Sequence, residues 1–132
     1  MGSSSTRAVY LDTHVVVWLN YGRVEDFALQ VRNLIESNDL KISPIVRLEL
    51  ALLNEIGRIH ETSDTIVENL GALIGLTICD ASFQTVAKRA CAYSWTRDPF
   101  DRLICAQAAF QDAILITKDR LIRRHYKKAT WT

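Results

Sequence analysis

Apolar residues follow two periods along the chain. Five short apolar runs have the length of strands, and they occupy residues 8–11, 40–42, 76–79, 114–117 and 129–131. Between them, apolar residues recur every three or four positions, which is typical of helices. The segments with this spacing are 14–19, 25–37, 44–56, 63–74, 83–91, 99–111 and 120–126. Strands that alternate with helices favour a parallel sheet covered on both faces. The pattern therefore predicts an α/β fold, a three-layer α/β/α sandwich around a mostly parallel sheet of about five strands.

The chain has the length and composition of one globular domain. It has 132 residues, of which 48% are hydrophobic and 23% are charged, as in ordinary soluble domains. We expect a single domain over residues 8–132, preceded by a polar, disordered leader at 1–7. No apolar run approaches the roughly 20 residues that span a bilayer. Three cysteines without a CxxC motif fit a reducing compartment. The sequence therefore predicts a cytoplasmic protein with no membrane partner.

Two acidic residues come directly after predicted strands. Asp12 follows the first strand, and Asp119 follows the strand that ends at Thr117. Ligands of open α/β sheets bind outside the carboxyl ends of the strands, so both acids are expected at one edge of the sheet. Thr117 is placed to orient a water or a carboxylate there. Each acid is also a favourable N-cap for the helix that follows it, which is the alternative explanation of its position.

Glu49 lies within an apolar stripe of a predicted helix. Its neighbours on that stripe are Ile45, Leu52 and Ile56. The carboxylate should therefore be buried or half-buried, and a buried carboxylate is costly unless it is paired or bound to a metal. The alternative to a metal ion is an ion pair with an arginine such as Arg47 or Arg102.

A fourth acid, Asp101, lies in the first turn of the helix predicted at 99–111. Asp98 and Pro99 suit the N-cap and the first helical position, and the helix dipole favours an acid at the third position. Capping therefore accounts for Asp101 taken alone. It does not account for four acids that all lie at element ends or on apolar faces of one small domain.

The four acids together predict a site for a divalent cation. Carboxylate and water oxygens are the ligands preferred by Mg²⁺ and Mn²⁺. A bound ion activates a water for in-line attack on phosphorus and stabilises the leaving oxygen. The candidate catalytic and metal-binding residues are Asp12, Glu49, Asp101 and Asp119. Carboxylates packed this closely would repel one another without the ion.

Basic residues cluster in the last fifteen positions, although the formal net charge is only +1. The cluster consists of Lys118, Arg120, Arg123, Arg124, Lys127 and Lys128. A local basic patch can bind phosphates, and this one adjoins Asp119 in the sequence. Arg97 and Arg102 flank the turn of the fourth acid and are expected to do the same. A solvated, positively charged tail is the alternative for the cluster.

Motifs for other chemistries are absent from the sequence. None of the three histidines belongs to an HxxxH or HxH set, and there is neither a GxSxG motif nor a glycine-rich phosphate loop. We interpret His14 as a packing residue or as a support for the acids. We interpret Trp18, Trp95 and Trp131 as core or interface residues rather than as platforms for base stacking.

Four segments carry a recognisable set of motifs, at residues 11–19, 47–50, 97–108 and 115–119. The stretch Arg-Asp-Pro-Phe-Asp-Arg at 97–102 is the most specific of them, and Asp-Thr-His at 12–14 is less so. With these motifs the chain resembles the PIN-domain nucleases, in particular the VapC toxins of bacterial toxin–antitoxin pairs. The resemblance extends from residue 8 to Trp131.

The resemblance implies a PIN-like fold and Mg²⁺- or Mn²⁺-dependent cleavage of RNA by an endoribonuclease. It maps the acidic set onto Asp12, Glu49, Asp101 and Asp119, with Asp98 as an accessory ligand and Thr13 and Thr117 as supporting hydroxyls. It also implies a homodimer and a cognate antitoxin whose tail occupies the active-site groove. Many relatives have His where this chain has Thr96. This difference leaves the acidic set intact and removes any substrate contact made by that His.

Two alternatives remain open from the sequence. The domain could act mainly as a module of an antitoxin-dependent repressor complex, with little nuclease activity. It could also be a phospho-acceptor signalling domain, in which Asp80 is phosphorylated and Asp12 holds Mg²⁺, with Thr117 and Lys118 as the switch pair. The second alternative leaves two of the four acids without a role.

Overall fold

The computed structural model describes residues 7–132, so the leader expected at 1–7 lies outside the described residues except for Arg7. Five strands form one sheet in the order β3-β2-β1-β4-β5, and every neighbouring pair is parallel. The strands are β1 (Ala8–Leu11), β2 (Asp39–Ile42), β3 (Thr77–Ile78), β4 (Ile114–Ile116) and β5 (Ala129–Thr130). The prediction of a mostly parallel sheet of about five strands is confirmed.

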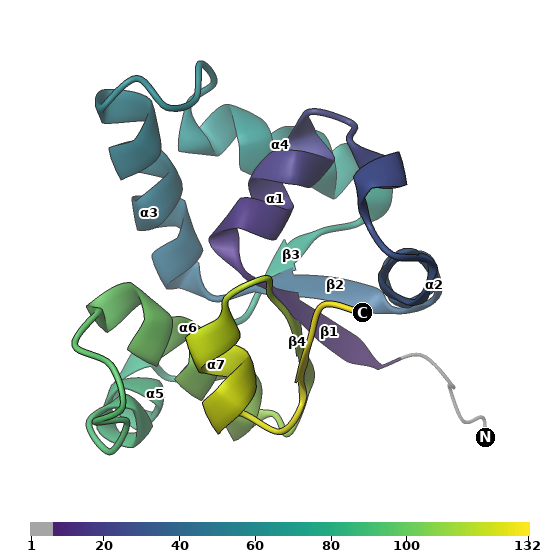
Figure 1. Cartoon of the computed structure of the whole chain (residues 1–132). Helices are drawn as coiled ribbons and strands as arrows, with labels where there is room; N and C mark the ends of the chain where they lie inside the picture. The colour runs from purple at the N-terminus through teal and green to yellow at the C-terminus, as the bar shows by residue number, and fades with distance from the viewer. Residues whose placement is uncertain (1–6) are drawn as a thin grey trace.

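Helices cover both faces of the sheet (Figure 1). One face carries α1 (Thr13–Asn20), α2 (Leu29–Ser37), α3 (Pro44–Glu55) and α4 (Ser63–Ile74). The other face carries α5 (Phe83–Ala90), α6 (Pro99–Phe110) and α7 (Arg120–His125). The molecule is therefore the three-layer α/β/α sandwich that the sequence predicts. None of the helices within residues 7–132 has the length and apolar character needed to cross a membrane.

The direction in which the sheet grows reverses between β1 and β4. From β1 the chain builds outward through β2 to β3, and it then returns to place β4 on the other side of β1 and β5 beyond it. The connections on the two sides use opposite faces, which opens a crevice at the carboxyl ends of β1 and β4. The backbone N–H of Asp12 donates to the carbonyl of Ile116 at 3.0 Å. This bond holds the two strand ends together at the crevice.

Two helices begin at this same edge of the sheet. Ser43 follows β2 and caps α3, since its hydroxyl accepts the N–H of Ile45 at 3.3 Å. The same hydroxyl donates to Oε1 of the buried Gln107 of α6 at 3.0 Å, which ties α6 to the start of α3. Because α6 leads into β4, it runs against the strand direction and also starts at the carboxyl edge. The first turns of both helices therefore lie beside the crevice.

The core fills the space between the sheet and its two helix layers. The central strands are its most buried part, with Val9, Leu11, Leu115 and Ile116 at most 1% exposed. Burial of one such side chain stabilises the fold by about 1.5–3 kcal/mol. The strand ends that carry Asp12 and Asp119 are therefore anchored in the most buried part of the molecule.

The helix expected at 25–37 begins later than its apolar periodicity suggests. Val24–Asp26 forms a 3₁₀ turn, and Phe27 is extended before α2 starts at Leu29. Phe27 is only 3% exposed because its ring packs against Trp18 and Trp131. Long-range aromatic packing, rather than a helix, therefore accounts for the apolar character of this position.

Helix α3 buries a different stripe from the one expected. Val46 and Leu50 are fully buried, whereas Leu52 and Ile56 are 39% and 68% exposed. Apolar residues occur on several sides of this helix, so their spacing alone does not select the side that faces the core. Glu49 lies next to the buried stripe and is half-buried, as the sequence predicts.

Candidate functional site

Asp12 lies at the end of β1 and is only 6% exposed. Its Oδ1 accepts the N–H of Thr13 at 2.8 Å, and its Oδ2 accepts the hydroxyl of Thr117 at 2.6 Å. The first bond makes Asp12 the N-cap of α1, which is the structural role that the sequence allows for it. The second joins residues 105 positions apart, so capping alone does not account for this carboxylate.

Thr117 links the ends of β1 and β4. It is fully buried, and the oxygen that donates to Asp12 also accepts the N–H of Asp119 at 3.0 Å. The carboxylate of Asp119 accepts the N–H of Ile122 at 2.9 Å and thereby caps α7. One hydroxyl therefore fixes the relative positions of two acids that are far apart in the sequence.

Glu49 reaches the same site from α3. Its carboxylate accepts a hydrogen bond from the hydroxyl of Thr13. The arginines considered as ion-pair partners are engaged elsewhere: Arg47 pairs with Asp64 at 3.1 Å, and Arg102 donates through Nε to a backbone carbonyl at 2.8 Å. Among the described residues, Glu49 thus contacts the element that carries Asp12 rather than an arginine.

Burial and the closeness of several acids raise the pKa values of two carboxylates in this site. Burial, followed by the charges of Asp98, Asp119, Asp12 and Glu49, raises the pKa of Asp101 to about 7. Burial also raises the pKa of Glu49, and Asp12 and Asp98 raise it further, although the hydrogen bond to its carboxylate opposes the shift. Without a counter-ion, the site disfavours simultaneous ionisation of its acids.

All four acids line one hollow of about 650 Å³, which we call the acidic pocket. Its lining residues are Asp12, Thr13, His14, Val17, Trp18, Glu49, Leu53, Arg58, Ile59, Asp101, Lys118 and Asp119. Within residues 7–132, no group of three or more His, Cys, Asp or Glu side chains is close enough to hold a metal ion directly. The pocket therefore concentrates negative charge without forming a closed set of ligands.

Asp98 does not line the acidic pocket and is exposed. Its Oδ1 accepts the N–H of Phe100 at 2.8 Å and that of Asp101 at 3.2 Å, so it caps α6. Thr96 supports this turn, because its hydroxyl accepts the N–H of Asp98 at 3.2 Å. The geometry gives Asp98 a structural role, and metal binding by it stays a prediction.

Of the basic residues predicted to bind the substrate, Lys118 lines the acidic pocket. The others, which do not line it, are Arg97, Arg102, Arg120, Arg123 and Arg124. Arg97 and Arg102 donate to carbonyls of the loop before α6, and Arg123 donates to the carbonyl of Lys118 at 3.1 Å. Closeness to the acids in sequence therefore did not predict which cations enter the pocket.

Besides aliphatic residues, the pocket lining includes three aromatic or charged residues that the sequence did not assign to substrate or metal binding: His14, Trp18 and Arg58. Nε2 of His14 accepts the N–H of Lys118 at 2.9 Å, so its ring proton is on Nδ1, which lies 3.7 Å from Oδ2 of Asp12. Burial lowers the pKa of His14, against the opposing charge of Asp12. His14 and Trp18 are one helical turn apart on α1, and that spacing after Asp12 is a signal that could have placed them.

Asp80, the acceptor in the signalling alternative, is not part of this site. It is exposed after the edge strand β3, and β2 separates β3 from the strand that carries Asp12. It does not line the acidic pocket. The geometry therefore gives no support to a phospho-acceptor arrangement of Asp80 and Asp12.

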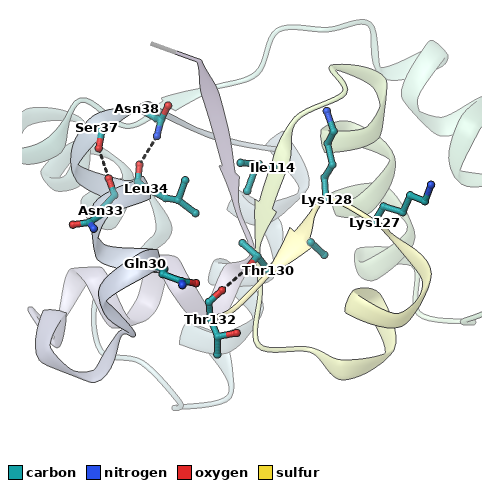
Figure 2. Close-up of a pocket in the computed structure, with 11 residues that line it drawn as sticks. Gln30, Asn33, Leu34, Ser37, Asn38, Ile114, Lys127, Lys128, Thr130 and Thr132 are labelled. Carbon is teal, nitrogen blue, oxygen red and sulfur yellow. Dashed lines mark hydrogen bonds between the residues drawn. The ribbon is translucent and has the colours of Figure 1, made fainter. Parts of the chain in front are cut away.

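A second hollow of about 610 Å³, the α2–β5 hollow, lies between α2 and the C-terminal strand (Figure 2). Its lining residues are Gln30, Asn33, Leu34, Ser37, Asn38, Ile114, Lys127, Lys128, Ala129, Thr130 and Thr132. Two of its hydrogen bonds are local: Nδ2 of Asn38 donates to the carbonyl of Leu34 at 2.9 Å, and the hydroxyl of Thr130 donates to the carbonyl of Thr132 at 3.0 Å. Lys128 instead donates to the carbonyl of Asp112 at 2.9 Å. It shares no residue with the acidic pocket and has no acidic side chain in its lining.

Solved structures share this architecture. The chain is similar to the VapBC2 complex from Rickettsia felis bound to a DNA fragment from its promoter, with a TM-score of 0.66 and 19% identity over 89% of this chain and 92% of that chain. It is also similar to a toxin–antitoxin complex from Klebsiella pneumoniae, with a TM-score of 0.65 and 21% identity over 92% of this chain and 95% of that chain. At these identities the likeness shows the fold.

Comparison at the level of sequence gives a family. No curated protein matches the chain. The family model of the PIN domain matches residues 9–128, which include all four acids of the pocket. The match covers nearly the whole sequence, and the chain therefore belongs to the PIN domain family.

Proposed function

We propose that the chain is a Mg²⁺- or Mn²⁺-dependent endoribonuclease that hydrolyses RNA phosphodiesters and acts as the toxin of a toxin–antitoxin pair. The observation that carries this proposal is the convergence of Asp12, Glu49, Asp101 and Asp119 on one pocket. The pKa of about 7 for Asp101 reflects burial and mutual repulsion, and a cation would offset both.

The four carboxylates fit a hydrated divalent ion. Mg²⁺ commonly keeps several waters and takes one or two carboxylates together with substrate phosphates. This habit suits a pocket in which, among residues 7–132, no three acidic groups are close enough to bind one ion directly. Both oxygens of Asp12 accept hydrogen bonds, and each keeps another lone pair for the ion or its waters. We assign ion binding to Asp12, Glu49, Asp101 and Asp119. Such an ion, when bound, supplies an activated water and neutralises the leaving oxygen.

Other residues of the chain orient the acids and the substrate. The hydroxyls of Thr13 and Thr117 hold Glu49 and Asp12, respectively. Lys118 is an exposed cation in the pocket lining and is suited to bind an RNA phosphate. We assign the basic residues outside the pocket, which the sequence predicted as RNA contacts, to the flanking RNA.

An RNA substrate and an antitoxin partner rest on similarity to other proteins. The motifs resemble those of VapC ribonucleases, and both structures compared above are toxin–antitoxin complexes. Leu48 of α3 and Ile56, which directly follows this helix, are 50% and 68% exposed, and an apolar surface of this kind suits a protein partner. We propose that an antitoxin binds the chain and that the toxin is a homodimer.

A cleavage assay tests the enzymatic proposal. Purified protein should cleave RNA with Mg²⁺ or Mn²⁺ and stop when a chelator is added. Asp12→Asn should abolish cleavage, whereas the matched variant Asp112→Asn should not, because Asp112 is exposed and pairs with Lys128. Full cleavage by the Asp12 variant would show that the site is wrongly assigned, and cleavage in chelator would refute the metal requirement.

Expression in bacteria tests the toxin role separately. The unaltered chain should arrest growth, Asp12→Asn should not, and co-expression of the cognate antitoxin should restore growth. Growth arrest by the Asp12 variant would mean that toxicity does not depend on the nuclease site.

One observation favours a second function. The VapBC2 structure from Rickettsia felis holds a DNA fragment from its promoter. The alternative that we retain is a module of an antitoxin-dependent repressor complex with little nuclease activity. Binding of its own promoter DNA by the complex, combined with no RNA cleavage in any divalent metal, would favour this function over the first.

A further inference from the structure

The lining of the acidic pocket also includes an indole and two positively charged side chains. Helix α1 contributes Trp18 to the lining, and the loop after α3 contributes Arg58, opposite in charge to the four acids. Lys118, in the turn between β4 and α7, also lines the pocket, and its Nζ lies 5.5 Å from the centre of the Trp18 ring. A phosphodiester that reaches the carboxylates therefore brings its neighbouring nucleotides close to an indole and two cations.

The indole of Trp18 is held in a fixed position by aromatic contacts. Trp131 lies 5.4 Å from it at an interplanar angle of 73°, Phe27 lies 5.6 Å away at 44°, and His14 lies 6.5 Å away at 73°. These neighbours come from three separate parts of the chain, which restrains the ring. Trp18 is nevertheless partly exposed, so the ring is rigid without being sealed in the core.

Trp18 and Trp95 differ in the groups that lie over their indole rings. Trp95 is also partly exposed, but the ring of His125 lies parallel to it at 4.9 Å and 3°. None of the aromatic rings paired with Trp18 among the described residues is parallel to it. Two side-chain cations, those of Arg23 and Lys118, lie over it at 4.8 and 5.5 Å. The Trp18 ring is therefore covered by two flexible cationic side chains rather than by a parallel ring, so a base that stacks on it takes the place of one of them.

The positive charge of two of these lining residues is available to a ligand. Arg23 is paired with Asp26 at 2.6 Å, whereas Arg58 and Lys118 are exposed and take part in no ion pair within the described part of the chain. Unpaired cations beside four carboxylates would gain most from a polyanion that enters the pocket.

We propose that Trp18, Arg58 and Lys118 form a nucleotide subsite that binds one base and the adjoining phosphates of single-stranded RNA beside the four carboxylates. The subsite rests on the proposed function, because it requires RNA to be the substrate. In a duplex, both faces of each base are covered by the stack, so only an unstacked base can lie on the indole. Stacking on an aromatic ring tolerates any base, so the subsite selects strand state rather than sequence.

Binding of a short fluorescent RNA to a protein that cannot cleave it tests the subsite directly. The Asp101→Asn background with Mg²⁺ should bind a single-stranded octanucleotide, and Trp18→Leu in that background should weaken binding about 5- to 100-fold, the range for loss of one base–aromatic stack. Trp18→Phe should retain most of the affinity. Trp95→Leu is the matched control and should leave affinity unchanged, because its face is already occupied by His125.

An abasic probe separates stacking from folding. Removing the bases from the octanucleotide should weaken its binding to the protein with Trp18 intact, and Trp18→Leu should then cause no further loss. Equal affinity for the abasic and the normal RNA would overturn the proposal even if Trp18→Leu fails to fold. Equal affinity for a blunt RNA duplex would also overturn it.

Salt dependence tests the cations. Each phosphate contact contributes about 0.7 to the slope of log Kd against log salt for single strands. Arg58→Gln and Lys118→Gln should each lower the slope by about this amount. Lys88→Gln, on the exposed side of α5, should leave it unchanged. An unchanged slope for Arg58→Gln would remove Arg58 from the subsite.

The binding measurements and the cleavage assay can refute the subsite and the nuclease activity separately. If the RNA binds with these dependences but no metal supports cleavage, the subsite stands and the nuclease is wrong. If RNA is cleaved but Trp18→Leu and the abasic probe change nothing, the nuclease stands and the subsite is wrong.

Discussion

The acidic pocket and the α2–β5 hollow are nearly equal in size, about 650 and 610 Å³, but differ in their electrostatics. The acidic pocket gathers four carboxylates and raises the pKa of Asp101 to about 7. The α2–β5 hollow contains amides, hydroxyls and two lysines, and the hydrogen bonds drawn in Figure 2 join neighbours in the sequence, whereas Lys128 bonds to the more distant Asp112.

The difference teaches that volume does not identify a site. Where polar groups find hydrogen-bond partners, an empty hollow costs the fold little. Where carboxylates from separate elements crowd into one pocket, their mutual repulsion destabilises the fold, and such a cost is retained where it serves a ligand. Mutations and changes of pH test this contrast.

The boundary of the acidic pocket can be tested with two neighbouring acids of α6. Asp101→Asn should lower the rate of RNA cleavage on the order of 10³-fold, as loss of one electrostatic group in an active site commonly does. Asp98→Asn should retain most of the activity, because Asn caps a helix as well as Asp does and Asp98 lies outside the pocket lining. Comparable losses in both variants would extend the site to Asp98 and blur its boundary.

Stability against pH should reveal the strain in the acidic pocket. The folded state holds the proton of Asp101 more tightly than the unfolded state, so the free energy of unfolding in chelator should fall as the pH rises from about 4 to about 7. Asp101→Asn removes the part of this dependence that is due to Asp101 and should be more stable than the unaltered chain at pH 8, by on the order of 2 kcal/mol, since solvent screens part of the repulsion. The two proteins should converge near pH 4. Urea unfolding at a series of pH values measures this, and parallel curves would contradict the repulsion.

Threonine-to-valine substitutions compare the hydrogen bonds of the two hollows. Thr117→Val should lower the free energy of unfolding by about 1–3 kcal/mol, because it leaves buried partners on Asp12 and Asp119 unsatisfied. Thr130→Val in the α2–β5 hollow should cost less than about 0.5 kcal/mol, because its bond to Thr132 is local and exposed. Chemical denaturation at neutral pH measures both, and equal losses would mean that the Thr117 bridge has no special weight.

Substitutions in the α2–β5 hollow should have little effect on RNA cleavage or on the free energy of unfolding. Asn33→Ala and Lys127→Gln should change neither RNA cleavage nor stability by more than about 0.5 kcal/mol, since neither residue contributes to the acidic pocket. A large loss of cleavage in either variant would give this hollow a function and would break the contrast.

The layered fold could be predicted from the sequence because short apolar strands and helical spacing alternate clearly. The position of Asp12 and Asp119 at one sheet edge could be predicted because each follows a strand. The bond from Thr117, two residues before Asp119, to Asp12 agrees with this prediction. The face of α3 could not be predicted, because its apolar residues occur on several sides and only Val46 and Leu50 are fully buried.

Side chains brought to the pocket by long-range packing escaped sequence analysis. Arg58 lies in a loop with no motif, and Trp18 was interpreted as a core or interface residue because its local pattern is apolar. Conversely, Arg97 and Arg102 lie close to Asp101 in the sequence but donate to backbone carbonyls of the loop before α6. Closeness in the sequence does not say in which direction a side chain points, and this direction decides whether the residue lines a pocket.

The bridge between Asp12 and Thr117 also bears on how the protein is made. It joins residues 105 positions apart, and β1 pairs directly with β4 across the same separation. Contacts between such distant segments form late and slow the folding of a chain. During synthesis, β1 must wait for β4 before the centre of the sheet can close. A nascent chain that stops short of Asp119 therefore lacks a complete acidic pocket, so interrupted translation yields fragments without this site.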